Sequence, residues 1–431
     1  MVNEIFEAKS FAVVGASREE YKVGHVIFRN LISKGIKAIP VNPNADSILG
    51  VKCYKSLLDI DKVECIIIAV PAKFVPSVLK DMAKKGFKNA VIISSGFLEV
   101  GNEKLNDEIR KIACDNKINL IGPNTMGFIN PYNNVNTSFS DGMPDKGNIA
   151  FISQSGAIGA AVLDRRIKLS GFVSIGNSLI VDFSHFIEYF SNDKNTHVIV
   201  LYIESLGENR GKKFIEACKK CKKPIIALKS GKSSLGSKAA SSHTAALASE
   251  VGIYEGIFKQ CGIIEVDSIK ELFQVADIYS RIRNPGKKVC IITNAGGPGV
   301  LCSDYCIRYG IEIPELPDRV KNDLNKIIPI GWSNNNPVDI LGDAKAELYS
   351  QTIKILEKEN FFDFFIILLT PQYMTEPYKT AEVVLGIERK PVVACFMGGD
   401  KVQMSINHLK DKIPVFDELK EMVIALGKRV N

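Results

Sequence analysis

The stretch NIAFISQSGAIG, residues 148–159, runs from a continuous apolar segment through a loop of serine and glycine into a helix-like segment. FAVVGAS at 11–17 and KVCIITNAGGPG at 288–299 share that pattern. It predicts a buried strand, a tight loop and the start of a helix. The glycines that align in the three stretches lie 141 residues apart in each case. This spacing predicts three domain-sized units rather than a solenoid, because solenoid repeats are far shorter.

The rest of the chain continues the alternation of strand-like and helix-like segments. Runs such as CIIIAVP at 65–71 are continuously apolar, and amphipathic stretches such as FVPSVLKDMAKKG at 74–86 separate them. Continuous apolar strands between helices are typical of a parallel sheet that is covered on both faces. The sequence therefore predicts the α/β class, with three Rossmann-like or flavodoxin-like domains built on doubly wound parallel sheets.

The length of 431 residues is enough for about three domains. We expect a first domain at 1–128, a second at 148–283 and a third at 284–431. Residues 129–147, INPYNNVNTSFSDGMPDKG, are rich in Asn, Ser, Gly and Pro. That composition is typical of a linker, so we expect one between the first two domains.

The charge balance is mild, with 55 Lys and Arg against 48 Asp and Glu and a net charge of +7. The sequence contains no long Lys/Arg run that could follow a phosphate backbone, so no nucleic-acid partner is expected. The N-terminus lacks a basic start followed by an apolar core, and the most apolar stretches are too short to span a bilayer. We therefore expect no membrane association and a cytoplasmic location.

The ten cysteines fit a reducing compartment, because most of them lie in apolar strand-like or helix-like contexts. Cys218 and Cys221 form a lone CxxC in a Lys-rich segment, with no second CxxC and no nearby histidine. We expect reduced structural thiols there and no metal site.

The first glycine loop, VGASREEYKVG at 14–24, is not a GxGxxG dinucleotide fingerprint. The next strand ends in VNPN at 41–44, without the acidic residue that holds the ribose diol of NAD. This disfavours an NAD-dependent oxidoreductase, the alternative that a Rossmann-like first domain suggests. The small Ser17 and the cationic Lys22 suit a pyrophosphate or another phosphate group.

The second loop and one histidine are candidates for phosphoryl chemistry. Ser153 and Ser155 add hydroxyls beside Gly156, although two serines and a glycine at a helix start also make an ordinary N-cap. His243 lies among small residues in GSKAASSHTAALA, and a neutral imidazole is a good phosphoryl acceptor. Glu204 ends the apolar strand HVIVLYIE, where a carboxylate can orient an imidazole. From the residues alone, a hydrogen-bonded structural His243 and a solvated Glu204 remain open alternatives.

Motifs along nearly the whole chain resemble the α subunit of NDP-forming acyl-CoA synthetases, the superfamily of succinyl-CoA synthetases and ADP-forming acetate–CoA ligases. The first third resembles their CoA-binding domain through VGAS, KVG, VNPN, AVPA, SSGF and GPNTMGF. The middle resembles their phosphohistidine domain through ISQSGAIG, VDFSHFIEY, VLYIES and SKAASSHTAALA. The last part resembles their C-terminal α-chain domain through ITNAGGPGV, NNNPVDILGDA and LLTPQYM.

The resemblance implies roles for particular residues. The CoA-binding residues that it implies are Gly15, Ser17, Lys22, Val23, Gly24, Val70, Pro71, Ser94, Gly96 and Asn124. The phosphate-binding residues that it implies are Ser153, Gln154, Ser155 and Gly156. It further implies that His243 is phosphorylated during turnover and that Glu204 assists it. Ala245 and Ser205 replace glycines that are usual in the family, and this departure motivates the alternative of a non-catalytic, CoA-binding regulatory protein.

No stretch resembles an ATP-grasp module or a Walker A motif. In the family that module belongs to a β subunit or to a fused half, so we expect an α subunit that pairs with an ATP-grasp β subunit as an α2β2 heterotetramer. CoA is expected on this chain, and Mg²⁺ with ADP or ATP on the partner subunit. The implied reaction interconverts acyl-CoA, ADP and phosphate with a small organic acid, CoA and ATP, through an acyl phosphate and a phosphohistidine.

Overall fold

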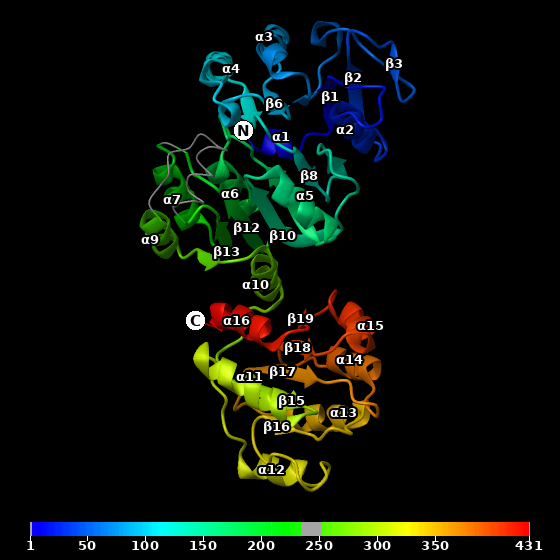
Figure 1. The fold of residues 1–431 in the computed structure, drawn as a ribbon, viewed down its shortest axis with the longest axis vertical. Helices are drawn as coiled ribbons and strands as arrows, with labels where there is room; N and C mark the ends of the chain where they lie inside the picture. The colour runs from blue at the N-terminus through cyan, green and yellow to red at the C-terminus, as the bar shows by residue number, and fades with distance from the viewer. Residues whose placement is uncertain (1, 208, 234–250, 431) are drawn as a thin grey trace. The chain divides into compact units, whose positions relative to one another are not determined.

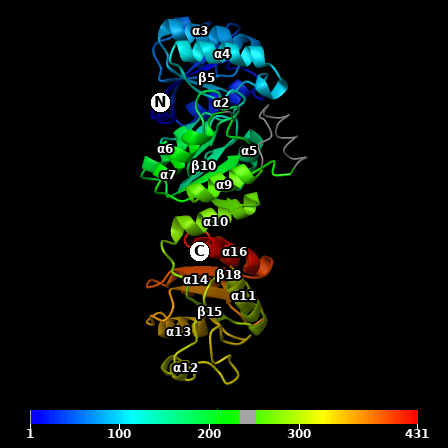
Figure 2. The ribbon, with the colours of Figure 1, turned by 90° about the vertical axis from the view of Figure 1, so that its left-hand side faces the viewer.

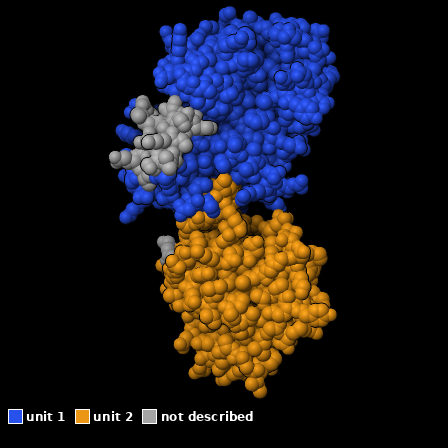
Figure 3. All heavy atoms as spheres, viewed as in Figure 1, with its two compact units in different colours: residues 1–268 blue, residues 269–431 orange. Residues whose placement is uncertain are grey.

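The computed structural model describes residues 2–207, 209–233 and 251–430 (Figure 1). The chain divides into two compact units, residues 1–268 and 269–431 (Figure 3). The first unit holds two large sheets and the second unit holds one.

The first sheet has five parallel strands in the order β2-β1-β5-β6-β7. Its strands are β1 (Ser10–Val14), β2 (Lys37–Val41), β5 (Cys65–Ile68), β6 (Asn89–Ile92) and β7 (Asn119–Ile121). Its helices are α1 (Val2–Phe6), α2 (Val23–Ile32), α3 (Val75–Lys85) and α4 (Glu103–Asp115), and a small hairpin joins β3 (Ser47–Ile48) to β4 (Val51–Lys52). The strands read as continuous apolar runs because helices cover both faces: α3 and α4 cover one face and α2 covers the other (Figure 2).

The second sheet has seven strands in the order β14-β13-β12-β10-β11-β8-β9. Five of them are parallel: β10 (Lys146–Ser153), β11 (Leu169–Ser174), β12 (Val198–Ile203), β13 (Ile225–Lys229) and β14 (Ile264–Val266). β8 (Phe128–Asn130) and β9 (Val135–Asn136) extend the edge beside β11 in antiparallel pairing. Its helices are α5 (Gly156–Asp164), α6 (Phe183–Asn192), α7 (Gly211–Lys220) and α9 (Val251–Cys261).

The segment 129–147, whose composition predicts a linker, contributes to the second sheet. It continues β8, contains β9 and includes the start of β10, and much of it is buried. Two of its polar side chains bond to backbone carbonyl groups: Asn130 Nδ2 donates to the buried Phe6 O at 3.0 Å, and Asn136 Nδ2 donates to Gly142 O at 2.8 Å. An Asn- and Ser-rich stretch therefore reads as a loop although it forms the edge of a sheet.

The third sheet also has five parallel strands, in the order β16-β15-β17-β18-β19. Its strands are β15 (Val289–Thr293), β16 (Val338–Asp339), β17 (Phe364–Leu369), β18 (Val392–Phe396) and β19 (Val415–Phe416). The helices of this unit are α10 (Ile269–Arg281), α11 (Gly296–Arg308), α12 (Asp318–Leu324), α13 (Ala346–Leu356), α14 (Pro377–Leu385), α15 (Asp400–Leu409) and α16 (Leu419–Val430). Helix α10 belongs to this unit, whereas the boundary that we expect from the sequence, at 283/284, would assign it to the second domain.

The parallel strands of all three sheets follow the order 2-1-3-4-5 when they are counted along the chain. This is the flavodoxin-like arrangement, so the predicted α/β fold class is confirmed. In this arrangement ligands bind beyond the carboxyl ends of the strands where the order reverses. That position lies between β1 and β5 in the first sheet and between β10 and β12 in the second.

One hydrophobic core joins the first two sheets. The ring of Phe6 lies 5.3 Å from the ring of Phe128 and 5.3 Å from that of Phe190, all three fully or almost fully buried. The same core includes Phe11 of β1 and Ile152 of β10. Burying aromatic side chains of this size contributes several kcal/mol each, which fixes the two sheets against each other.

Candidate functional site

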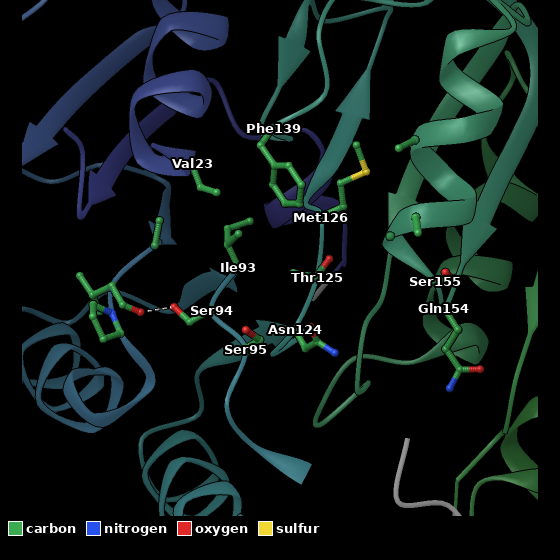
Figure 4. A pocket seen from close by; sticks show the side chains of 16 residues that line it. Val23, Ile93, Ser94, Ser95, Asn124, Thr125, Met126, Phe139, Gln154 and Ser155 are labelled. Atoms are coloured by element: carbon green, nitrogen blue, oxygen red, sulfur yellow. Dashed lines mark hydrogen bonds between the residues drawn. The ribbon is translucent and has the colours of Figure 1, made fainter. Parts of the chain in front are cut away.

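A cavity of about 630 Å³ opens at the carboxyl ends of β5, β6, β7 and β10 (Figure 4). It lies beside the strand reversal of the first sheet, where the topology favours a ligand. Eight of the residues singled out from the sequence line it: Val23, Val70, Pro71, Ser94, Asn124, Gln154, Ser155 and Gly156. The structure thus brings candidates for CoA binding and for phosphate binding around one space.

Several other candidates are not among the residues that line this space: Gly15, Ser17, Lys22, Gly24, Gly96 and Ser153. Gly15 has a φ of +89°, and a Cβ on it would lie 2.4 Å from Ala69 O. A Cβ on Gly24 would lie 2.0 Å from Gly15 O. These two glycines allow the loop after β1, the start of α2 and the end of β5 to touch. Their effect on the cavity is therefore one of packing.

The two polar candidates of the first loop have mainly local partners. Ser17 Oγ accepts the Glu19 N–H at 3.0 Å, and Ser17 O lies 2.8 Å from Nδ1 of the buried His25. Lys22 is exposed, and its Nζ lies 3.9 Å from a carboxylate oxygen of Glu19. A surface pair at that distance is weak, so the ammonium group remains available to an anion.

Ser94 and Asn124 hold the floor of the cavity together. Ser94 Oγ donates to Val70 O, a hydrogen bond drawn in Figure 4, and this links the end of β6 to the end of β5. Ser94 O accepts the Asn124 N–H at 2.9 Å. Asn124 has a φ of +57°, which asparagine tolerates better than most residues.

The loop after β10 leads directly into a helix that starts at the cavity. Ser155 is the N-cap of α5, and its Oγ accepts the Ile158 N–H at 3.3 Å. The fully buried Ser153 donates its hydroxyl hydrogen to Ser155 O at 2.8 Å. Gly156 and Ala157, in the first turn, line the cavity. Free backbone N–H groups and the positive end of the helix dipole make such a turn suitable for an anion.

Gln154 connects this loop to the loop after β12. Its Oε1 accepts the backbone N–H of Glu204 at 2.8 Å and that of Ser205 at 2.9 Å. With the oxygen used in this way, the amide Nε2 is the polar group that Gln154 offers to the cavity it lines. Ser205 replaces a glycine that is usual in the family that this chain resembles. Its φ is not positive, so the backbone of this loop does not require glycine here, and its Oγ accepts the Gly207 N–H at 3.1 Å.

Lys229 is a functional candidate that the sequence reasoning missed. It ends β13, is 9% exposed, and donates from Nζ to Glu204 O at 2.9 Å. Burial lowers the pKa of this ammonium group although the nearby Glu204 opposes the shift. A lysine at the end of the apolar run IIALK is the same signal that singled out Glu204, and it was available in the sequence. His243 and Ala245 lie outside the described residues.

The apolar walls of the cavity were also missed. Ile93, Met126 and Phe139 line it, together with Ala157 and Ala160 of α5. Met126 stands within the quoted motif GPNTMGF, but Phe139 lies in the segment expected as a linker and carries no signal in the sequence. Apolar walls with a few polar groups are typical of small-molecule sites.

Further structural findings bear on the other expectations. Within the described ranges, no cluster of three or more His, Cys, Asp and Glu residues is arranged to hold a metal ion. Cys218 and Cys221 are free thiols, and burial raises the pKa of Cys218. Among the helices described, none combines the length and the apolar character that crossing a membrane requires.

Comparison with known proteins places the chain in a family. A CoA binding domain matches residues 9–131, a succinyl-CoA ligase like flavodoxin domain matches 146–279, and a Ligase-CoA domain matches 289–429. The chain is 37% identical to the acetate–CoA ligase [ADP-forming] II subunit alpha of Pyrococcus furiosus, over 99% of this chain and 96% of that protein. It belongs to the family of ADP-forming acyl-CoA ligases. The resemblance stated from its motifs is confirmed.

Other members of the ADP-forming acyl-CoA ligase family are longer. The chain is 40% identical to acetate–CoA ligase [ADP-forming] I of Archaeoglobus fulgidus over 99% of its own length, but it spans only 63% of that relative. Among solved structures it resembles a dinucleotide forming acetyl-coenzyme A synthetase 1 of Ca. Korarchaeum cryptofilum in complex with phosphate and ADP. That match has a TM-score of 0.94 and 34% identity, and covers 99% of this chain and 96% of the other.

Proposed function

We propose that this chain carries the CoA and phosphate half of an ADP-forming acyl-CoA ligase. The overall reaction would interconvert acyl-CoA, phosphate and ADP with an organic acid, CoA and ATP. One observation supports this most strongly: Val70, Ser94 and Asn124 border the same cavity as Gln154 and Ser155. A reaction between a thioester and phosphate needs both binding sets at one place.

The residues of the cavity fit the two ligands. The apolar Val23, Ile93 and Phe139 suit the methylene groups of a pantetheine arm, while Ser94 and Asn124 offer polar contacts to its amides. When bound, CoA supplies the thiol that carries the acyl group. Phosphate would lie at the start of α5, where backbone N–H groups and the helix dipole stabilise negative charge without reorganisation.

We infer the second half-reaction from the family resemblance. A ring nitrogen of His243 would form a P–N bond while the P–O bond of an acyl phosphate breaks, and the carboxylate leaves as the acid. Glu204 would stabilise the positive charge that the imidazole gains. This role is supported by two hydrogen bonds to the backbone of Glu204: its N–H donates to Gln154 Oε1, and its carbonyl oxygen accepts from Lys229 Nζ.

We further propose that the phosphoryl group passes to ADP, with Mg²⁺, on an ATP-grasp β subunit, in an α2β2 assembly. Two relatives from Pyrococcus furiosus are named as α subunits, and longer relatives extend beyond the part that this chain matches. A cytoplasmic location stays a prediction from the sequence.

Phosphorylation of the purified chain tests this proposal. The chain is incubated with radiolabelled ATP and a candidate ATP-grasp subunit, and separately with labelled acetyl phosphate. We expect an acid-labile label on wild type, none on H243A, and acyl-CoA formation that depends on both subunits. CoA binding with no label under either condition would instead support the regulatory alternative.

A further inference from the structure

Three side chains, those of Glu99, Asn177 and Asn124, form a hydrogen-bonded relay that ends at the cavity. Asn177 Nδ2 donates to Glu99 Oε2 at 2.6 Å, and Asn124 Nδ2 donates to Asn177 Oδ1 at 3.4 Å. The other carboxylate oxygen, Glu99 Oε1, accepts the N–H groups of Gly96 at 2.5 Å and Phe97 at 3.2 Å. Asn124 lines the cavity, whereas Glu99 and Asn177 are not among its lining residues.

Glu99 sets the direction of the hydrogen bonds in this relay, that is, which side-chain group donates and which accepts. An ionised carboxylate can only accept hydrogen bonds, so Asn177 must turn its NH₂ group toward it. Burial raises the pKa of Glu99, but the hydrogen bonds from Asn177 and Gly96 outweigh burial and lower it overall. The carboxylate is therefore charged at neutral pH.

Each amide then fixes the next one. Because Asn177 gives its NH₂ to Glu99, its oxygen faces Asn124, and Asn124 must donate in turn. That leaves Asn124 Oδ1 as the end of the relay, with no hydrogen bond to it among the described residues. The cavity is thereby given an acceptor rather than a donor at this position.

We propose that Glu99 and Asn177 are positioning residues that hold Asn124 Oδ1 toward the cavity to accept an amide N–H of the pantetheine arm of CoA. This inference rests on the proposed function, because it assumes that CoA occupies this cavity. The two amides of the pantetheine arm are the N–H donors of that part of the ligand. A flipped Asn124 would present NH₂ to such an N–H and would repel it.

The substitution E99Q tests the relay with almost no change in shape. The oxygen of the substituted side-chain amide must still accept the N–H groups of Gly96 and Phe97, so its NH₂ faces Asn177. Asn177 and then Asn124 are forced to flip, and a donor replaces the acceptor at the cavity. Calorimetry compares CoA with two analogues in which one or the other pantetheine amide N–H is replaced by an ester oxygen.

We expect wild type to bind CoA about 5-fold more tightly than one of the two analogues, the size of one net hydrogen bond. E99Q should bind CoA and that analogue within about 2-fold of each other. N124G, which suits the positive φ at this position, should also lose the preference with Glu99 and Asn177 intact. E103Q makes the same charge change on the exposed start of α4 and should keep it.

The outcomes separate this inference from the proposed function. If wild type does not bind CoA, the proposed function itself fails. If wild type binds CoA with a preference for the amide and E99Q keeps that preference, the positioning role of Glu99 is wrong. If E99Q does not fold, N124G alone decides whether Asn124 accepts the pantetheine amide N–H. If N124G keeps the wild-type preference for CoA over the ester analogue, the proposal is overturned.

Discussion

The side-chain oxygen of Gln154 accepts the backbone N–H of Glu204 at 2.8 Å and thereby ties the loop after β10 to the end of β12. The neighbouring N–H of Ser205 bonds to the same oxygen. One side chain thus holds the phosphate-binding candidates beside the candidate carboxylate, at the strand reversal of the second sheet. Its two polar atoms differ in their partners, because the oxygen is used within the protein and the NH₂ group is the polar atom left for a ligand in the cavity that Gln154 lines.

Two substitutions at Gln154 separate those tasks. Q154E keeps an acceptor for both N–H groups but places negative charge at the cavity, so it should stay stable while its KM for phosphate rises at least about 10-fold. Q154M removes the acceptor and should lose about 1–3 kcal/mol of unfolding free energy. Urea unfolding and initial rates at varied phosphate measure both. A destabilised Q154E with unchanged KM would contradict this assignment.

Ser155 allows a similar separation of helix capping from anion binding. S155A loses the cap of α5 and should cost about 1 kcal/mol of unfolding free energy. S155D keeps a good N-cap, so its stability should match wild type, but its carboxylate should repel phosphate and raise the KM for phosphate about 10-fold or more. Equal phosphate KM values in S155D and wild type would place the phosphate elsewhere.

Gly15 and Gly35 form a matched pair for backbone packing. Both have positive φ, +89° and +73°, but only at Gly15 would a Cβ meet backbone atoms closer than 3 Å. G35A should cost about 1 kcal/mol, the conformational penalty of Ala at positive φ. G15A should cost at least about 2 kcal/mol and weaken CoA binding, since Ala69 must move. Chemical denaturation and CoA titration check this, and equal costs for the two variants would refute it.

Phe139 tests whether the apolar wall contacts the ligand. Its side chain is 41% exposed and lines the cavity, so F139A should leave stability nearly unchanged and weaken CoA binding about 3- to 10-fold. Phe74, 49% exposed and outside the cavity lining, provides the control F74A, which should bind CoA normally. Calorimetric titration compares the two, and identical affinities would remove Phe139 from the site.

Asp182 predicts a pH dependence of stability. Burial raises the pKa of this carboxyl, but the hydrogen bond from His185 and the charges of His185 and Arg210 lower it overall. Because the folded pKa lies below the unfolded one, the carboxylate stabilises the fold above about pH 4, and this contribution is lost as the pH falls through the folded pKa. The stability difference between wild type and D182N should therefore shrink in acid.

The exposed D59N serves as the control for that measurement. Its stability should stay close to that of wild type across the same pH range, because the Asp59 side chain is open to solvent. Urea unfolding from about pH 6 down to about pH 3 provides the comparison. A D182N curve parallel to wild type throughout would show that Asp182 does not make this contribution.

Much of the fold followed from the sequence, because continuous apolar strands report burial on two faces directly. The strands after which Gly15 and Gly156 stand are β1 and β10, as predicted. In the segment 129–147, Asn130 and Asn136 bond to backbone carbonyl groups, and composition cannot reveal such contacts. Phe139, which lines the cavity, lies in that same segment.

By itself, the sequence determined the α/β class, the family and the set of loops around which a site forms. These depend on local periodicity and on short motifs such as GPNTMGF and ISQSGAIG. Only the tertiary structure decided that Asn124 and Gln154 border one cavity. It also decided that Asn177, which bonds to Asn124, donates to Glu99, and that Gln154 accepts the N–H groups of Glu204 and Ser205. These contacts join residues far apart in the chain, and a hydrogen bond between distant loops leaves no periodic trace in the sequence.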